Sequence, residues 1–469
     1  MSLENVVALA RNEAGIAAAV GILKQRFGDR AQTGQAIREQ HGHTTTYVPT
    51  QAPDIVVFAQ NTQDVQDVVR ICAEHRVPVV AFGAGSSLEG QVNAPAGGVS
   101  LDMTGMNRVV AVHAEDLDCV VEPGVTRREL NEYLRDTGLF FPIDPGANAT
   151  LGGMASTRAS GTNAVRYGTM RENVLALKAV MPDGRLIETS KRVKKTAAGY
   201  DLTRLLVGAE GTLGIITELT LKLQGIPQAI SGGICPFPDV DSACRTVIET
   251  IQMGIPVARI ELVNTLQMQA LILHSKLPYE AQPYLFVEFH GTESSVAEQA
   301  ELFGEIAAGN GGGDFQWTQN TEERDRLWRA RHDAYFASLL LRPGCKGVST
   351  DVCVPISRLA DCIGETEKDL AESNIIAPIV GHVGDGNFHL LLLLDTDDAS
   401  EMERAEAFMD RLAKRAISME GTCTGEHGIG QGKMKYLPME LGDATDYMRA
   451  IKKTLDPDNI MNPGKILIS

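Results

Sequence analysis

The segment between Pro142 and Gly168 limits how this chain can fold, because it consists mostly of Gly, Ala, Ser, Thr and Asn. With few large side chains, it can form little hydrophobic core by itself, and its backbone is suited to lie close against a bound ligand. The loop Phe82–Gly90 has a similar composition and follows an expected strand at 77–82, as a phosphate-binding turn should. The chain is therefore expected to place glycine-rich backbone around a cofactor.

Composition narrows the class of protein. The 469 residues are 43% hydrophobic and 22% charged, as in soluble globular proteins of two or three domains. The net charge of −17 argues against a nucleic-acid partner. Eight cysteines without a Cys-x-x-Cys pair, and an N-terminus without a basic signal region, predict reduced thiols and a cytoplasmic protein. A peripheral association with the cytoplasmic side of a membrane, and a homodimer, remain compatible with the sequence.

Hydrophobic periodicity predicts alternating helices and strands. A helix is expected over 3–27, a strand–helix–strand unit from Ile55 to Phe82, and a boundary near Pro227 after which a second α/β rhythm begins. In this second part we expect one long helix over 321–341 and a strand over 349–354. The sequence predicts four regions: an N-terminal arm 1–50, a cofactor domain 51–226, a substrate or cap domain 227–420 and a C-terminal segment 421–469.

Two histidines flank a glycine-rich turn in the string Gly381–His389. Gly384 and Gly386 permit the positive φ values of a tight reversal, which would bring His382 and His389 together. With Glu426, two imidazoles and one carboxylate suit zinc or manganese, with iron as a third candidate, and leave positions open for substrate. Without the Glu426-His427 pair, two buried core histidines would be the better interpretation.

The glycine-rich stretches Gly83–Gly90, Pro145–Gly153, Ser160–Asn163 and Gly208–Ile216 resemble those of the vanillyl-alcohol-oxidase and para-cresol-methylhydroxylase flavoproteins. The resemblance implies an α+β fold: a two-subdomain FAD-binding domain of the para-cresol-methylhydroxylase (PCMH) type, an α/β cap domain and a C-terminal return to the flavin domain. It implies non-covalent FAD, since Ser86 and Ser87 stand where covalent members often carry histidine. The FAD-binding residues that it implies are Gly83, Ala84, Gly85, Ser86, Ser87, Gly90, Pro145, Gly146, Gly152, Gly153, Ser156, Ser160, Gly161, Asn163, Glu210, Gly211, Gly214, Ile216 and Asn462.

The C-terminal half is most similar to the D-lactate dehydrogenase (cytochrome) group, with glycolate oxidase D subunits and D-2-hydroxyglutarate dehydrogenases as relatives. The motifs that carry this similarity are Trp328–His332, Arg342–Lys346, Ser349–Pro355, Gly381–His389, Thr422–Gly430 and Met461–Lys465. The resemblance implies oxidation of a small 2-hydroxy acid, with hydride transfer to flavin N5. A metal held by His382, His389 and Glu426 would lower the pKa of the substrate hydroxyl.

Two residues are expected to act on the substrate directly. His427 would take the hydroxyl proton, and Arg331 would clamp the carboxylate with its planar guanidinium. Asn387 and Arg342 are weaker candidates for substrate or flavin contact. An ordinary solvated arginine is an equally good interpretation of Arg331, since no acid lies three or four residues from it.

Two alternatives stay open. One is D-2-hydroxyglutarate oxidation, although Ser349-Thr350-Asp351 lacks the basic residue that those relatives place there, with only Lys346 near. The other is a flavin subunit that needs an iron–sulfur partner, since no cysteine cluster is present. In each case a separate acceptor, a cytochrome, a quinone or an electron-transfer flavoprotein, would receive the electrons.

Overall fold

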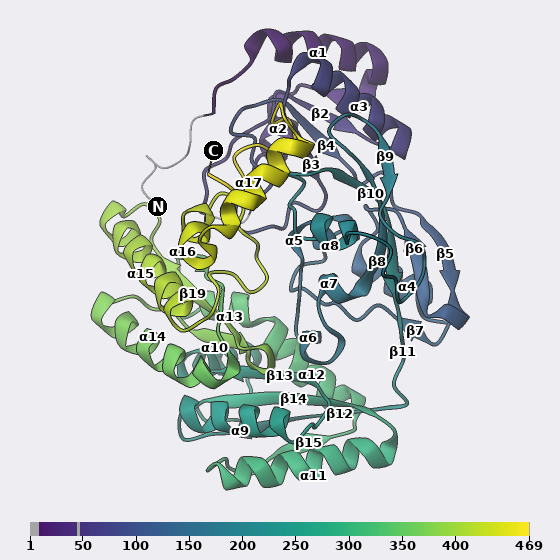
Figure 1. The fold of residues 1–469 in the computed structure, drawn as a ribbon. Helices are drawn as coiled ribbons and strands as arrows, with labels where there is room; N and C mark the ends of the chain where they lie inside the picture. The colour runs from purple at the N-terminus through teal and green to yellow at the C-terminus, as the bar shows by residue number, and fades with distance from the viewer. Residues whose placement is uncertain (1–8, 45–46, 469) are drawn as a thin grey trace. The chain divides into compact units, whose positions relative to one another are not determined.

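The computed structural model describes residues 9–44 and 47–468 of the chain (Figure 1). Helices and strands are mixed throughout, and the chain divides into two compact units. Of the described residues, those within 3–160, 168–226 and 426–469 form the N-terminal unit, and those within 161–167 and 227–425 form the central unit. The domain boundaries expected from the sequence stay a prediction, and each unit is described by itself. Within the described ranges, no helix is long and apolar enough to cross a membrane.

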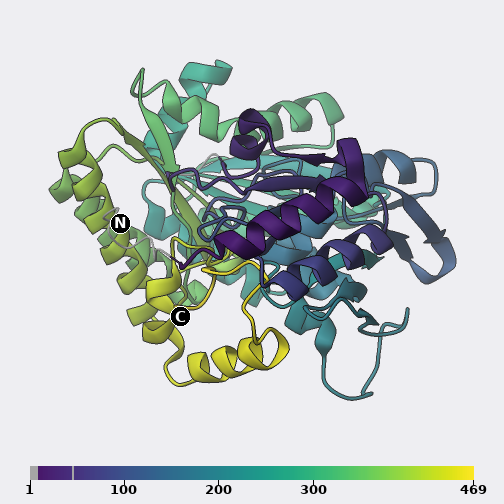
Figure 2. The ribbon, with the colours of Figure 1, turned by 90° about the horizontal axis from the view of Figure 1, so that it is seen from above.

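The N-terminal unit begins with a sheet whose strands run in the order β1-β2-β4-β3, with β2, β4 and β3 parallel. Helix α3 follows β2 and is capped by Asn61, whose side chain accepts a hydrogen bond from the Asp64 N–H. Figure 2 shows α1 and α3 as neighbouring helices, and both bury aliphatic side chains against this sheet. The elements are α1 (Glu13–Phe27), β1 (Ala31–Gln32), α2 (Gln35–Gln40), β2 (Ile55–Phe58), α3 (Thr62–His75), β3 (Val79–Phe82) and β4 (Val99–Asp102).

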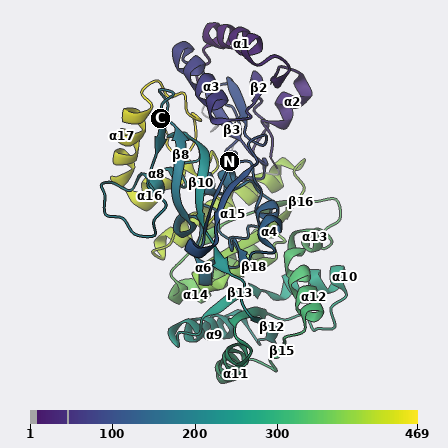
Figure 3. The same ribbon diagram turned by 90° about the vertical axis from the view of Figure 1, so that its right-hand side faces the viewer.

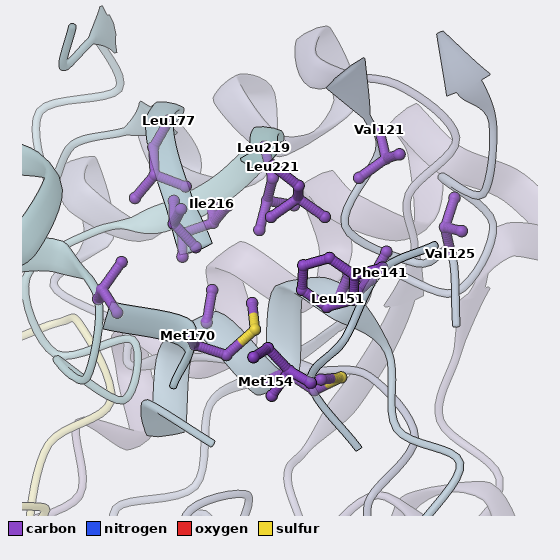
Figure 4. Packing of buried hydrophobic residues seen from close by; sticks show 14 of the residues in the cluster. Val121, Val125, Phe141, Leu151, Met154, Met170, Leu177, Ile216, Leu219 and Leu221 are labelled. Carbon is purple, nitrogen blue, oxygen red and sulfur yellow. The ribbon is translucent and has the colours of Figure 1, made fainter. Parts of the chain in front are cut away.

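A second, antiparallel sheet of this unit has the strand order β5-β6-β10-β8-β9. Its core side chains, among them Phe141, Leu151 and Leu219, pack between α5 and the strands (Figure 4). The elements are β5 (Val109–His113), β6 (Asp118–Val121), α4 (Arg127–Leu134), β7 (Leu139–Phe140), α5 (Leu151–Thr157), α7 (Met170–Asn173), β8 (Val174–Val180), β9 (Leu186–Glu188), α8 (Leu202–Leu206), β10 (Ile215–Lys222) and β11 (Gln224–Gly225).

The C-terminal segment returns to the N-terminal unit with α16 (Leu437–Leu441) and α17 (Ala444–Leu455) (Figure 3). Its last residues join the first sheet, since Met461 forms a bridge with Val79. Lys452 on α17 donates to the carbonyl oxygen of Thr212 at 2.8 Å. The predicted return of the C-terminal segment is therefore present in the structure.

The central unit is built on a large antiparallel sheet with the order β15-β12-β14-β13-β18-β19-β16, and β17 also pairs with β19. Apolar side chains of α10, α12 and α13 pack on one face of it, and α11 packs on β12 and β14. The elements are α6 (Ala164–Tyr167), β12 (Ala229–Pro236), α9 (Val240–Gln252), β13 (Val257–Val263), α10 (Thr265–Ser275), β14 (Tyr284–Gly291), α11 (Glu293–Gly309), β15 (Gln316–Thr318), α12 (Thr321–His332), α13 (Ala334–Leu339), β16 (Lys346–Ser349), β17 (Val352–Cys353), α14 (Leu359–Ser373), β18 (Ile379–His382), β19 (Asn387–Leu394) and α15 (Ala399–Ser418).

Three local predictions differ from the structure. The first helix starts at Glu13, capped by Asn12, and the residues before 9 lie outside the described part. The helix expected over 321–341 is divided at Asp333, which ends α12 and begins α13. The strand expected over 349–354 is interrupted between β16 and β17, because the Thr350 and Asp351 side chains there form hydrogen bonds to β19 and its neighbours.

Candidate functional site

The register of three adjacent strands gathers polar side chains in the central unit. β13 pairs with β18 so that Leu262 lies opposite Gly381, which sets Glu261 opposite His382. β18 pairs with β19 so that His382 lies opposite Asn387. Because side chains two residues apart on a strand share a face, His389 projects on the same face as His382. The two imidazole centroids lie 5.3 Å apart, as the predicted reversal requires.

The reversal itself uses one glycine differently from the prediction. Gly386 has φ +77°, but Gly384 is not in the left-handed region and lies within a 3-10 turn over Val383–Asp385. A Cβ on Gly384 would approach side-chain atoms of Val165 and Ile260 to 2.6 and 2.7 Å. Gly384 is therefore required for close packing, and Gly386 for the backbone turn.

The tautomer of each histidine follows from its Nδ1 partner. His382 Nδ1 lies 2.7 Å from the Glu261 carboxylate, and His389 Nδ1 lies 3.0 Å from the Thr350 carbonyl oxygen. A carbonyl or carboxylate oxygen only accepts, so Nδ1 is the protonated nitrogen in each neutral ring and Nε2 carries the lone pair. Histidines that bind metals through Nε2 are held in this way.

A short segment carries Glu426 to the same place. Thr422 forms a bridge with Cys353 of β17, and Thr424 donates its hydroxyl proton to Asp351 at 2.7 Å. Gly425 follows, and a Cβ there would lie 2.2 Å from the Asn387 amide nitrogen, so only glycine passes. Glu426 is the next residue. One ligand atom from each of His382, His389 and Glu426 lies within 4.8 Å of the others.

These donors fit a divalent metal. Two imidazole nitrogens and a carboxylate are the ligand set of zinc, manganese and iron sites that keep positions for a substrate. The predicted trio is thus brought together, and the interpretation as two ordinary core histidines does not explain the nearby carboxylate.

Arg331 lies on α12, nine-tenths buried, and its Nη2 donates to Glu261 at 2.5 Å. The solvated interpretation of this arginine is therefore wrong. Its partner, Glu261, is 70 residues away in sequence, so the neighbouring helix positions gave no sign of this ion pair. Its Nε is buried without a hydrogen-bond partner among the described residues, so the guanidinium keeps donor capacity beyond Glu261.

Glu261 is the residue of this site that the sequence reasoning missed. Its side chain is 1% exposed and has His382 on one carboxylate oxygen and Arg331 on the other. Burial alone would raise the pKa of the Glu261 carboxyl, but the charges and hydrogen bonds of His382 and Arg331 outweigh burial and lower it. The available signal was a pair of charges, Arg259 and Glu261, inside an otherwise apolar central strand.

The two weaker candidates have defined partners. Asn387 donates from Nδ2 to Asp351 and to the Val352 carbonyl oxygen, both at 2.8 Å, and supports the turn. Arg342 forms a two-pronged ion pair with Glu401 on α15, with Nη2 at 2.9 Å from Oε2. Arg342 is thereby tied to the neighbouring helix.

The glycine-rich residues expected to hold FAD are mostly in the N-terminal unit. Gly85 and Gly90, in the loop after β3, have φ +63° and +76°. The Ser87 hydroxyl is buried and has no hydrogen-bond partner among the described residues. A loop of this kind, with glycine backbone and an unsatisfied hydroxyl, fits the pyrophosphate of a dinucleotide.

Several of the other predicted FAD residues have packing or hydrogen-bonding roles within the protein itself. Gly83 and Gly152 are required for packing, since a Cβ would lie 2.2 Å from the Thr150 hydroxyl and 2.5 Å from Pro123 respectively. Gly161 and Asn163 belong to the central unit, where Asn163 accepts from Arg259 Nε at 2.7 Å. A contact of every predicted residue with FAD stays a prediction. The others in the described part are Ala84, Ser86, Pro145, Gly146, Gly153, Ser156, Ser160, Gly211, Gly214 and Ile216.

Glu210 and Asn462 tie the C-terminal segment to this region. The Glu210 carboxylate accepts from the Ile429 and Gly430 N–H groups at 2.7 and 2.8 Å. Asn462 donates to the carbonyl oxygens of Gln91 and Glu210. Burial raises the pKa of Glu210 to about 7, despite those two backbone hydrogen bonds. Both residues thus shape the backbone around the glycine-rich loop.

His427, the predicted proton acceptor, lies two residues before Ile429. Its carbonyl oxygen accepts from Gln91 Nε2 at 2.8 Å, and the next residue, Gly428, has φ +79°. The backbone at His427 is therefore fixed against the Gly83–Asn93 region within the N-terminal unit.

Family models match most of the chain. An FAD-binding domain matches residues 53–190, and the C-terminal domain of FAD linked oxidases matches residues 226–466. The chain belongs to the FAD-linked oxidases. It is therefore a flavoenzyme, an FAD-dependent oxidoreductase, as the resemblance implied.

Similar curated proteins cover most of the chain. A probable mitochondrial D-lactate dehydrogenase of Danio rerio is 51% identical over 97% of this chain and 92% of that protein. A mitochondrial D-lactate dehydrogenase [cytochrome] of Arabidopsis thaliana is 45% identical over 95% and 79% respectively. A glycolate oxidase subunit GlcD of Bacillus subtilis is 35% identical over 88% and 89%.

The fold also has solved counterparts. A p-cresol methylhydroxylase structure with substrate bound has a TM-score of 0.82, with 18% identity, covering 97% of this chain and 98% of that one. This similarity confirms the predicted fold: an FAD-binding part of the PCMH type followed by a cap with helices and strands.

The predicted cytoplasmic location is wrong. The relatives from Danio rerio, Arabidopsis thaliana and two yeasts are all named as mitochondrial enzymes, not cytoplasmic ones. The prediction failed because scattered cysteines do not distinguish among the compartments that keep thiols reduced.

Proposed function

We propose that this FAD-linked oxidase oxidises D-lactate and similar small D-2-hydroxy acids to 2-oxo acids in a divalent-metal-dependent reaction. The observation that carries the proposal is the His382–His389–Glu426 group, with Arg331 joined to it through Glu261. The D-lactate dehydrogenases among the relatives support the substrate. Relatives from Arabidopsis thaliana and Saccharomyces cerevisiae are named D-lactate dehydrogenase [cytochrome]. These names favour a cytochrome as the separate electron acceptor over a quinone or an electron-transfer flavoprotein.

Different residues of this chain would bind the substrate and accept its proton. Arg331 would hold the substrate carboxylate with the donors that Glu261 does not use, and His427 would accept the proton of the substrate hydroxyl. A divalent ion, when bound by His382, His389 and Glu426, would polarise that hydroxyl and lower its pKa. FAD, held non-covalently along the glycine-rich loops, would supply the two-electron acceptor.

The proposal is tested by substrate selectivity. The purified flavoprotein is mixed with D-lactate, L-lactate and D-2-hydroxyglutarate in separate assays with an artificial electron acceptor. We expect turnover with D-lactate, none with L-lactate and little with D-2-hydroxyglutarate. No turnover with any D-2-hydroxy acid, although FAD is bound, would refute the proposal.

D-2-Hydroxyglutarate remains the second candidate because Lys346 lies near the site in sequence. Lys346 is exposed at the start of β16, however, and so is poorly suited to a buried distal carboxylate. Faster turnover with D-2-hydroxyglutarate than with D-lactate would reverse the order of the two. The GlcD relative favours a third candidate, a flavin subunit that is active only with partner subunits. Dye-linked activity of the isolated chain would exclude this third candidate.

A further inference from the structure

The large sheet holds two buried glutamates in similar surroundings. Glu261 on β13 lies between His382 and Arg331. Glu288 on the adjacent β14 has His290 Nε2 at 2.8 Å and Arg259 Nε at 3.5 Å from one carboxylate oxygen, and Arg324 Nε at 3.9 Å from the other. Both carboxylates are at most 5% exposed. Only the histidine at Glu261 belongs to the proposed metal group.

We infer that Glu261 is a positioning residue that holds a metal-binding histidine and the carboxylate-binding arginine at once. Its Oε1 accepts from His382 Nδ1 at 2.7 Å, and its Oε2 accepts from Arg331 Nη2 at 2.5 Å. The first contact turns the His382 lone pair on Nε2 outward from the carboxylate; the second fixes the plane of the guanidinium. The inference rests on the proposed function, because the roles of His382 and Arg331 are taken from that function.

The two contacts have separable consequences. A carboxylate behind a metal-binding histidine fixes the ring and makes it more basic, and its loss weakens metal affinity about 10–100-fold. The contact to Arg331 instead orients the fork that would receive the substrate, so its loss raises KM. Because one carboxylate makes both contacts, one substitution should affect both quantities.

Glu261→Gln is the informative variant. The amide has one acceptor oxygen where the carboxylate has two, and its NH₂ would face a donor on either His382 or Arg331. It cannot serve both partners, although it keeps the size and shape of the side chain. Glu288→Gln is the matched control, since it makes the same change in a buried carboxylate that faces a histidine and two arginines one strand away.

The test measures three quantities on the FAD-containing wild type and both variants. Metal content is determined by elemental analysis, Zn²⁺ and Mn²⁺ affinity by chelator competition, and KM and kcat with D-lactate at low and saturating metal. For Glu261→Gln we expect affinity to fall about 10–100-fold. Saturating metal should restore kcat, while KM stays raised. Glu288→Gln should keep wild-type metal affinity. Its melting temperature measures how much thermal stability is lost when a buried Glu in this sheet is replaced by Gln.

Three outcomes would overturn the inference. Wild-type metal affinity and KM in Glu261→Gln would show that Glu261 positions neither partner. An equal loss of metal in Glu288→Gln would show that general packing is responsible. If the wild type binds no metal, both this inference and the metal dependence of the proposed function fail; if it binds metal and oxidises D-lactate while Glu261→Gln is unchanged, only the inference fails.

Discussion

Glu261 of the central unit and Glu210 of the N-terminal unit are both buried, yet their pKa values move in opposite directions. Burial raises the pKa of both carboxyls, but at Glu261 the charges of His382 and Arg331 outweigh it. Glu210 faces two backbone N–H groups and the more distant Lys465, and its pKa rises to about 7. Charged partners, more than burial, decide whether a buried carboxyl is ionised.

The two glutamates also differ in the groups that they orient. Glu261 orients two side chains that would meet the metal and the substrate. Glu210 orients backbone, at Ile429 and Gly430, and so fixes the segment that follows His427. We therefore expect substitutions at Glu261 to change chemistry and stability, and substitutions at Glu210 to change mainly stability and its dependence on pH.

The largest expected effect is on stability when each side chain is removed. Glu261→Ala leaves the Arg331 guanidinium buried without its counter-charge, which typically costs about 3–5 kcal/mol. Glu210→Ala leaves two backbone N–H groups without an acceptor, and we expect a smaller loss, about 1–3 kcal/mol. Urea unfolding followed by circular dichroism measures both. A Glu261→Ala/Arg331→Leu double variant more stable than Glu261→Ala would confirm the cause, and equal losses at the two glutamates would break the comparison.

The next effect sharpens the role of Arg331. Arg331→Lys keeps a positive charge near Glu261 but loses the planar fork that matches a carboxylate. A hydrogen bond to a charged group contributes about 1.5–3 kcal/mol, so KM for D-lactate should rise roughly 10–150-fold. Steady-state kinetics at saturating metal measure it, with metal content as the control. Unchanged KM would remove Arg331 from the carboxylate site.

The smallest effect is the pH dependence at Glu210. Its folded pKa of about 7 is above the unfolded value, so the protonated carboxyl stabilises the fold at low pH, and this contribution is lost as the pH rises toward 7. Glu210→Gln should remove this fall between about pH 5 and 7. The buried Lys465 acts in the opposite sense, because burial lowers its pKa to about 7 and its stabilising neutral form is lost as the pH falls. Melting temperatures across pH 5–9 measure the difference between wild type and variant, and parallel curves would contradict the assignment.

The sequence predicted the donors of the candidate metal group but not the residues that hold them. His382 and His389 flank a turn, and Glu426 lies in a glycine-rich motif, so their types and spacing were informative. Glu261 was missed because its partners are brought to it by strand register, across 70 residues for Arg331 and 121 for His382. Register depends on the whole sheet and cannot be read from a local window.

Local rules also explain where the fold prediction held and where it did not. Helix α3, capped by Asn61, lies between β2 and β3, as the strand–helix–strand unit predicted from Ile55 to Phe82 requires. The strand after Ser349 is broken because Thr350 uses its hydroxyl to accept from the Leu390 N–H, a contact between distant segments. Elements set by neighbouring residues could be predicted, whereas those shaped by long-range polar contacts could not.

The central claim is that this FAD-linked oxidase reduces its flavin with D-lactate only when a metal is held by His382, His389 and Glu426. The most direct measurement follows flavin absorbance after anaerobic mixing with D-lactate, before and after removal of metal by a chelator, and again after Mn²⁺ or Zn²⁺ is returned. The account predicts bleaching that disappears with the metal and returns with it. Bleaching at the full rate in protein shown by elemental analysis to be free of metal would contradict it.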